Sequence, residues 1–168
     1  MLKKILLIIL FNFFFLNPSF SQNKIAFIDL DSVIQNSKPG NKILQELNLL
    51  SKNNLDEIQK LQVELEKQEQ SIQTKKNIIS EEDYNKQLSS LRKKIAEYRK
   101  MKDIKSNDFN KIKNQKITNF FNNVNPIIQK YMDDNSLDLL FDRKNVFIGK
   151  VNSDITEDII SLIDKNYK

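Results

Sequence analysis

The side chains that could carry chemistry in this sequence are carboxylates and amines, because the chain contains no cysteine and no histidine. Thiol nucleophiles, imidazole bases and the two commonest protein ligands of transition metals are therefore absent. The densest acidic run, Glu81-Glu82-Asp83, could hold a cation or work as an acid. We favour the alternative that these acids fill the first turn of a helix capped by Ser80, where the helix dipole favours negative charge. We expect no catalytic residue and no metal site, and hence no enzyme.

Basic side chains gather in one segment of the chain. Residues 41–79 hold six basic and six acidic side chains, whereas residues 80–116 hold eleven basic and six acidic ones, a net charge of +5. Such a segment attracts acidic partners or an anionic membrane surface by long-range steering, and the alternative is an ordinary solvated helix face. We predict a binding surface that comprises every basic residue of this segment except Lys94, namely Lys86, Arg92, Lys93, Arg99, Lys100, Lys102, Lys105, Lys111, Lys113 and Lys116.

The first 22 residues predict a secretory signal. Lys3 and Lys4 give a basic start, residues 5–16 are almost entirely apolar, and Ser19-Phe20-Ser21 places small residues where a signal peptidase reads them. The alternative is a membrane anchor, but a twelve-residue run is shorter than the roughly 20 residues needed to cross a bilayer. We predict cleavage after Ser21 and export. Removal of two lysines then lowers the net charge from +5 to +3, which together with export argues against nucleic acid as a partner.

The stretch from Pro39 to about Asp134 predicts one long helix out, a turn near residues 80–83, and one long helix back. Its only glycine is Gly40, and apolar residues recur with heptad-like spacing. An arm of about 39 residues spans roughly 58 Å. Several core positions are polar, which predicts a weak seam and a flexible hairpin. The predicted seam comprises Leu44, Leu47, Ser51, Asn54, Ile58, Leu61, Leu65, Gln68, Ile72, Lys75 and Ile79 going out, and Tyr84, Leu88, Leu91, Ile95 and Tyr98 coming back, with Lys102 and Lys105 as an interruption before Phe109 and Ile112.

The apolar residues of this seam have two interpretations. Residues such as Leu61, Ile72, Leu91 and Met101 either hold the hairpin together or contact the side chains of a partner. We favour the first role. A weak seam also leaves room for a mixed one.

Three short strands are predicted to form a small base around the ends of the hairpin. Residues 24–31 predict a first strand, after which Asp31 or Ser32 caps a short helical turn. Residues 137–142 and 146–148 predict a C-terminal β-hairpin, with residues 143–145 as its turn and Gly149 at its end. The fold class is therefore α+β, with a long antiparallel helical hairpin inserted between an N-terminal strand and a C-terminal β-hairpin plus a short helix.

Two further features of the base follow from the sequence. Pro126 falls inside a helical pattern and predicts a kink, or a restart capped by Asn125. A closing helix is predicted to start at Asp154 or Thr156, with Glu157 at capping-box spacing from Asp154. Three strands leave open edges, which pairing with copies of the same chain would cover. The predicted oligomerisation residues are Ile25, Phe27, Ile28, Leu139, Phe141, Val146 and Ile148.

With these elements placed, the chain resembles the Skp/OmpH family of periplasmic chaperones for outer-membrane proteins. The N-terminal part of the resemblance is Lys24-Ile25-Ala26-Phe27-Ile28-Asp29, followed by residues 33–37 and Pro39-Gly40. The C-terminal part comprises Val124-Asn125-Pro126-Ile127-Ile128, Leu137-Asp138-Leu139-Leu140-Phe141-Asp142 and Asp154-Ile155-Thr156. The order and spacing of these motifs, together with the signal peptide, cover essentially the whole exported chain.

The resemblance implies a homotrimer shaped like a three-armed clamp, with the strands in a central β-barrel body and no cofactor or ATP. Its helical hairpins would enclose unfolded outer-membrane proteins in the periplasm as a holdase. Residues 1–21 would be the signal peptide, residues 22–38 and 117–168 the oligomerisation body, and residues 39–116 the arms. The alternative is a structural coiled-coil tether or scaffold of the cell envelope, which would have a tight, regular heptad seam.

Overall fold

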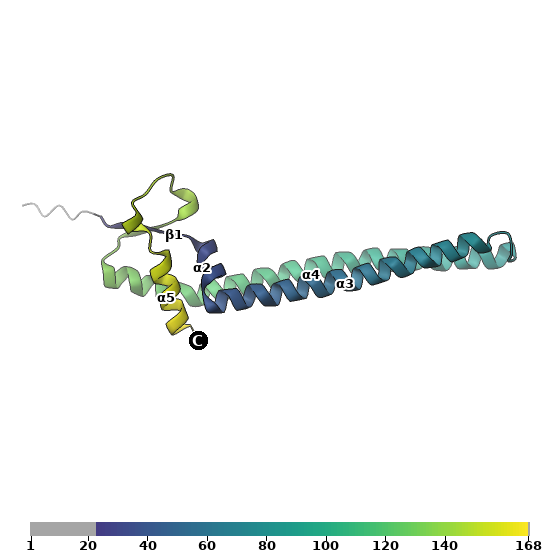
Figure 1. Cartoon of the computed structure of the whole chain (residues 1–168), viewed down its shortest axis with the longest axis horizontal. Helices are drawn as coiled ribbons and strands as arrows, with labels where there is room; N and C mark the ends of the chain where they lie inside the picture. The colour runs from purple at the N-terminus through teal and green to yellow at the C-terminus, as the bar shows by residue number, and fades with distance from the viewer. Residues whose placement is uncertain (1–22, 168) are drawn as a thin grey trace, which may run out of the picture.

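Two long helices and a small base make up the structure, a computed structural model that describes residues 23–167. Figure 1 shows α3 and α4 side by side as a long arm, with the other elements gathered at one end. The elements are β1 (Ile25–Ile28), α2 (Leu30–Asn36), α3 (Lys38–Lys75), α4 (Glu81–Asn135), β2 (Leu139–Asp142), the 3-10 helices η1 (Arg143–Asn145) and η2 (Val151–Ser153), and α5 (Thr156–Asn166). The predicted leader with its cleavage after Ser21 lies outside the described residues. Within residues 23–167, no helix is long and apolar enough to span a bilayer.

Serine side chains begin both helices of the arm. The Ser37 hydroxyl accepts a hydrogen bond from the Gly40 N–H at 3.3 Å, and Pro39 stands in the first turn of α3, where its missing N–H costs little. The Ser80 hydroxyl accepts from the Asp83 N–H at 3.1 Å, with three acids in the first turn of α4. The predicted cap at Ser80 is therefore confirmed. The two helices are joined by the short segment 76–80, so the chain reverses close to the predicted place.

The seam between α3 and α4 follows the predicted heptad pattern. Side chains at the predicted core positions of α3, from Leu44 to Ile72, are buried or half-buried, and most of their neighbours are exposed. Leu47, Ile72 and Leu91 are buried and mark the apolar ends of the seam, while its middle is only partly closed. The 38 residues of α3 give an arm of about 57 Å, so the predicted long helices are confirmed.

The base has a single apolar core built from both ends of the chain. Helix α5 packs on α2 and on the base end of α4, and its Ile159 and Ile163 are fully buried. Phe120 and Val124 of α4 are fully buried against the same core. Helix α4 therefore belongs to both the arm and the base. Because it is one continuous helix, the position of the base determines the direction in which the arm projects.

The sheet of the base has two parallel strands, with Ile25 opposite Leu139 and Phe27 opposite Phe141. The predicted C-terminal β-hairpin is wrong. After β2, the Asp142 carboxylate accepts from the Lys144 N–H at 3.0 Å and caps the 3-10 helix η1, and residues 146–148 form no strand. The other edge of β1 is met instead by the segment before α5, where the Ile155 N–H donates to the Phe27 carbonyl at 3.0 Å.

Three smaller expectations also need correction. The first strand ends at Ile28, because the Asp29 carboxylate accepts from the Ser32 N–H at 2.9 Å and caps α2, so neither Asp31 nor Ser32 is the cap. Helix α5 starts at Thr156, one of the two predicted positions, but its N-cap is Ile155, which makes no side-chain capping bond, so Asp154 and Glu157 do not form a capping box. Pro126 lies within the single helix α4, so the predicted restart at Pro126 is wrong and Asn125 caps no helix. Both Pro126 and Asn122, whose carbonyl loses its usual donor, are exposed, so water can satisfy that carbonyl.

Candidate functional site

The exposed cations of α4 form a surface along the arm. Arg92 and Arg99 are seven residues apart, as are Lys93 and Lys100, so each pair repeats after two helical turns at about 10 Å spacing. All four side chains are exposed, and we call them the basic stripe. Asp103 lies within one turn of Arg99 and Lys100, but within residues 23–167 none of the four makes an ion pair within 4.0 Å.

Lys102, Lys111 and Lys113 extend this surface toward the base. All three are exposed, and the described part of the chain offers none of them an ion pair. Because an unpaired ammonium at the surface keeps its full charge available, these three lysines and the basic stripe are the cations that can attract an acidic partner.

Three of the ten predicted cations are engaged within the chain. Lys86 pairs with Glu82 one turn away at 2.9 Å, with both side chains exposed. Lys116 Nζ lies 2.7 Å from Glu46 Oε2 across the two helices, and this hydrogen bond with its positive charge lowers the pKa of Glu46. Lys105 reaches across to Glu57 at 2.8 Å. Lys105 and Lys116 therefore join α3 to α4, and the structure does not group them with the open cations.

The exposed apolar side chains of the arm are not the ones that the periodicity singled out. Leu61, Ile72, Leu91 and Met101 lie buried or half-buried in the seam, as do the other apolar seam residues. Leu49, Leu55, Val63 and Ile104 instead stay exposed on the arm. The only signal in the sequence was that they fall outside the heptad core positions.

Two grooves open along the seam because its middle is incompletely filled. The first has a volume of about 260 Å³ and is lined by Ser51, Asn54, Leu55, Ile58, Lys102, Lys105, Ser106 and Phe109. The second, of about 200 Å³, is lined by Leu61, Glu64, Leu65, Gln68, Lys94, Glu97, Tyr98 and Met101. Both have mostly apolar floors, so the arm presents apolar surface next to charge.

The predicted oligomerisation residues divide into two groups in the base. Phe27 and Ile28 are buried within the chain's own structure. Ile25, Leu139, Phe141 and Ile148 are exposed, and Val146 is half-buried. Exposed Phe147 and Val151 were not predicted as part of this surface, although they flank Ile148 in sequence.

Phe27 is covered by its own chain. The Arg143 guanidinium lies 5.6 Å from the centre of its ring, and Arg143 also pairs with Asp154 at 2.6 Å. Gly149 packs on the ring edge, where a Cβ at residue 149 would lie 2.5 Å from a ring carbon. Only glycine allows this approach, so Gly149 holds the loop of residues 146–151 over β1 and leaves Phe147 and Ile148 pointing to solvent.

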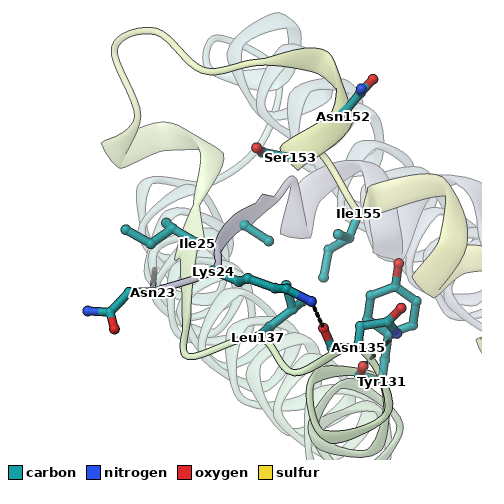
Figure 2. Close-up of a pocket in the computed structure, with 10 residues that line it drawn as sticks. Asn23, Lys24, Ile25, Tyr131, Asn135, Leu137, Asn152, Ser153 and Ile155 are labelled. Carbon is teal, nitrogen blue, oxygen red and sulfur yellow. Dashed lines mark hydrogen bonds between the residues drawn. The ribbon is translucent and has the colours of Figure 1, made fainter. Parts of the chain in front are cut away.

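Figure 2 shows a hollow of the base, of about 480 Å³, between the N-terminal residues, the end of α4 and the segment before α5. The Lys24 amine donates to the Asn135 carbonyl at 3.2 Å across it. Tyr131 at its edge donates its hydroxyl to Asp158 at 2.6 Å, and this hydrogen bond raises the pKa of Tyr131 to about 12. The lining contains no carboxylate. Among residues 23–167 no acids cluster in a metal-binding group. The hollow therefore offers no pair of carboxylates for acid–base chemistry.

This architecture is similar to that of known proteins. Residues 24–163 match the family model described as outer membrane protein (OmpH-like). No curated protein sequence matches the chain. Among solved structures, the fold is similar to that of a candidate outer membrane chaperone (OmpH-like) from Caulobacter crescentus CB15, with a TM-score of 0.77, 15% sequence identity and coverage of 86% of each chain. At this identity, the likeness to the solved structure bears on the fold alone.

Proposed function

The chain belongs to the OmpH-like outer membrane protein family, and from that premise we propose that it is an ATP-independent holdase of the periplasm. Its clients would be unfolded outer-membrane β-barrel proteins, held between the helical arms during transit. Such precursors carry alternating apolar strands with unpaired backbone groups, which aggregate readily when free. No cofactor is required, since holding an unfolded chain needs contacts and no covalent step.

The observation that carries this proposal is the combination of open cations with a partly closed seam on one arm. Arg92, Lys93, Arg99 and Lys100 are exposed and unpaired within the described residues, and two apolar grooves lie along the same hairpin. The charges raise the rate of encounter with acidic segments. The grooves and exposed leucines add weak apolar contacts, and many weak contacts together give affinity while the client remains mobile.

A cage needs more than one arm, and the base offers a surface for self-association. Ile25, Leu139 and Phe141 are half-exposed on the sheet, and Phe147 and Ile148 project from the loop beside it. Exposed apolar surface of this kind usually marks an interface. We propose that copies of the chain meet here, as a trimer in line with the family resemblance. Residues 39–116 would then be the free arms, and an anionic membrane surface would be a second partner of their cations.

The envelope tether remains the competing proposal, and the seam argues against it. A tether that transmits force is best served by a continuous apolar seam. Here Asn54 and Lys105 meet at the middle of the seam, with Lys105 Nζ 3.4 Å from Asn54 Oδ1. A solvated polar layer at this point suits an arm that adapts to its cargo better than a rigid strut.

The test uses the chain purified from the periplasm of an expressing host, whose intact mass also reports whether residues 1–21 have been removed. A urea-unfolded outer-membrane barrel protein is diluted into buffer with and without it, and light scattering is followed. We expect scattering to be suppressed near one oligomer per client, and suppression to weaken as salt rises. Absence of suppression for several such clients would contradict the holdase and favour the tether.

A further inference from the structure

We propose that the groove beside Lys102 is a docking site for one large apolar side chain of an unfolded strand that carries an acidic residue next to it. This inference rests on the proposed holdase function and names the segment of a client that this part of the arm selects. The groove lies between α3 and α4, with Leu55 and Ile58 on one wall and Phe109 on the other.

The size of the groove fits a side chain and not a small-molecule ligand. Its volume of about 260 Å³ is below the roughly 300–1,000 Å³ of typical ligand sites. Leu55 at its rim is 66% exposed, so apolar surface there remains in water until a partner covers it. Burying such surface stabilises a complex by about 25 cal/mol per Å², which favours an aliphatic or aromatic occupant.

The positive charge at the rim determines which type of residue is favoured next to the docked side chain. Lys102 is exposed, and the described residues provide it with no ion pair. Lys105, on the same rim, is held by Glu57, which does not line the groove. The lining contains no carboxylate, so its charges are positive only, and a carboxylate beside the docked side chain would meet Lys102.

The second groove of the arm provides the contrast. Its rim carries Glu64 and Glu97 beside Lys94, and Lys94 Nζ donates to the Gln68 side chain at 3.0 Å. With two carboxylates and one ammonium, that rim has a net charge of −1 and does not favour acidic neighbours. The two grooves of one arm therefore differ in selectivity, although both have apolar floors.

The alternation of a β-strand matches this geometry. Successive side chains of an extended strand point to opposite faces, with about 3.3 Å between residues. An apolar residue inserted between the helices therefore leaves its neighbours on the outer face of the strand, above the rim, where the long and exposed Lys102 side chain is the cation that reaches toward them. Barrel strands alternate apolar and polar residues, so a segment with acids at the polar positions would place an apolar side chain on the groove floor and a carboxylate within reach of Lys102.

Two labelled ten-residue peptides test the proposal directly, one of alternating Phe and Asp and one of alternating Phe and Lys. Fluorescence anisotropy measures their binding to the whole protein. We expect the Phe–Asp peptide to bind about threefold more tightly at low salt, as one exposed charge contact allows. Ser106→Leu fills the groove and should weaken binding of the Phe–Asp peptide at least tenfold. The matched control is Ser90→Leu, at an exposed site of α4 outside the groove lining.

A charge-reversing substitution tests the proposal independently, so the test holds even if Ser106→Leu disturbs the hairpin. Lys102→Glu changes an exposed side chain and should reverse the preference between the two peptides, whereas Lys67→Glu, the same change at an exposed site of α3 outside the groove lining, should keep it. Equal effects of Lys102→Glu and Lys67→Glu, or equal binding by Ser106→Leu and Ser90→Leu, would overturn the docking site. Either result would leave the holdase standing, because suppression of client aggregation by the unaltered protein is measured separately.

Discussion

Lys105 of α4 reaches into the seam of the arm and lies 2.8 Å from Glu57 of α3, with only 24% of its side chain exposed. Together with Asn54 it forms a polar layer where a coiled coil usually has apolar residues. A polar core position of this kind lowers the stability of a coiled coil and helps to fix its register. The layer therefore explains why the arm is closed at its ends and open at its middle.

We predict that replacing this layer by apolar residues stabilises the arm. The double variant Lys105→Leu with Asn54→Leu should raise the free energy of unfolding by about 1 kcal/mol, the lower end of what replacement of a buried ion pair gives, because Lys105 is partly exposed. Glu57 stays 56% exposed and does not become a buried charge. Thermal unfolding followed by circular dichroism measures the change. Lys111→Leu on the exposed surface is the control, and a lower melting temperature of the double variant than of this control would contradict the prediction.

The basic stripe should control how fast a client is captured. Changing Arg92, Lys93, Arg99 and Lys100 to Gln removes four positive charges with little change in helix propensity. We expect the association rate with an unfolded client to fall about tenfold at low salt and its salt dependence to shrink, measured by stopped-flow fluorescence. The control removes the same number of charges from α3 and the residue that follows it, through Gln at Lys52, Lys60, Lys67 and Lys76. Equal slowing by both variants would show that only net charge matters.

The exposed apolar loop of the base should hold copies of the chain together. Phe147 is 103% exposed and Ile148 is 85% exposed, so neither supports the fold of a single chain. Changing both to Asp should therefore convert the proposed oligomer into folded monomers, as read by sedimentation velocity and circular dichroism. Ile78→Asp at the tip of the arm is the matched control, since Ile78 is 80% exposed but far along the sequence from the base. An oligomer that persists in the double variant would place the interface elsewhere.

The hydrogen bond between Tyr131 and Asp158 ties α5 to α4, and it should weaken in strong base. Because the pKa of Tyr131 is raised from 10.0 to about 12 in the folded chain, its contribution is fully present below about pH 10 and is lost as the pH rises through 12. At neutral pH, Tyr131→Phe should lower the free energy of unfolding by about 1 kcal/mol after solvent screening. Urea unfolding from pH 8 to 12 measures this difference. A constant gap between the two proteins across that range would show that the bond does not titrate as stated.

The arm could be predicted from the sequence because its determinants are local. Heptad spacing from Leu44 to Ile72 and the Ser80 cap depend on residues within a few turns of one another. The pairing partner of a strand, in contrast, can lie anywhere. Ile25 pairs with Leu139, and no local pattern in either strand says that the pair is parallel. The third strand was predicted from the β-branched and aromatic side chains of residues 146–148, of which Phe147 and Ile148 face solvent in the single chain and Val146 is half-buried.

The site was predictable as a segment but not residue by residue. Net charge identified residues 80–116 as the basic side of the arm. Lys105 and Lys116 are paired with Glu57 and Glu46, and so they are not free to attract a partner. These two glutamates are 48 and 70 residues away in sequence. Only the register of the two helices brings them together. The continuity of α4 through Pro126 is a similar case, because it depends on the burial of side chains such as Phe120 in a core formed largely by other elements.

The most direct test of the central claim, that the protein keeps a client soluble and unfolded, uses the absence of tryptophan from the whole chain. The tryptophan emission of an outer-membrane barrel protein then reports on the client alone. After dilution from urea into the chaperone, we predict that the client stays in the supernatant on centrifugation, with emission close to that of its unfolded form, until lipid vesicles are added. A client that pellets to the same extent with and without the protein, or that emits as a folded barrel while bound, would contradict the account.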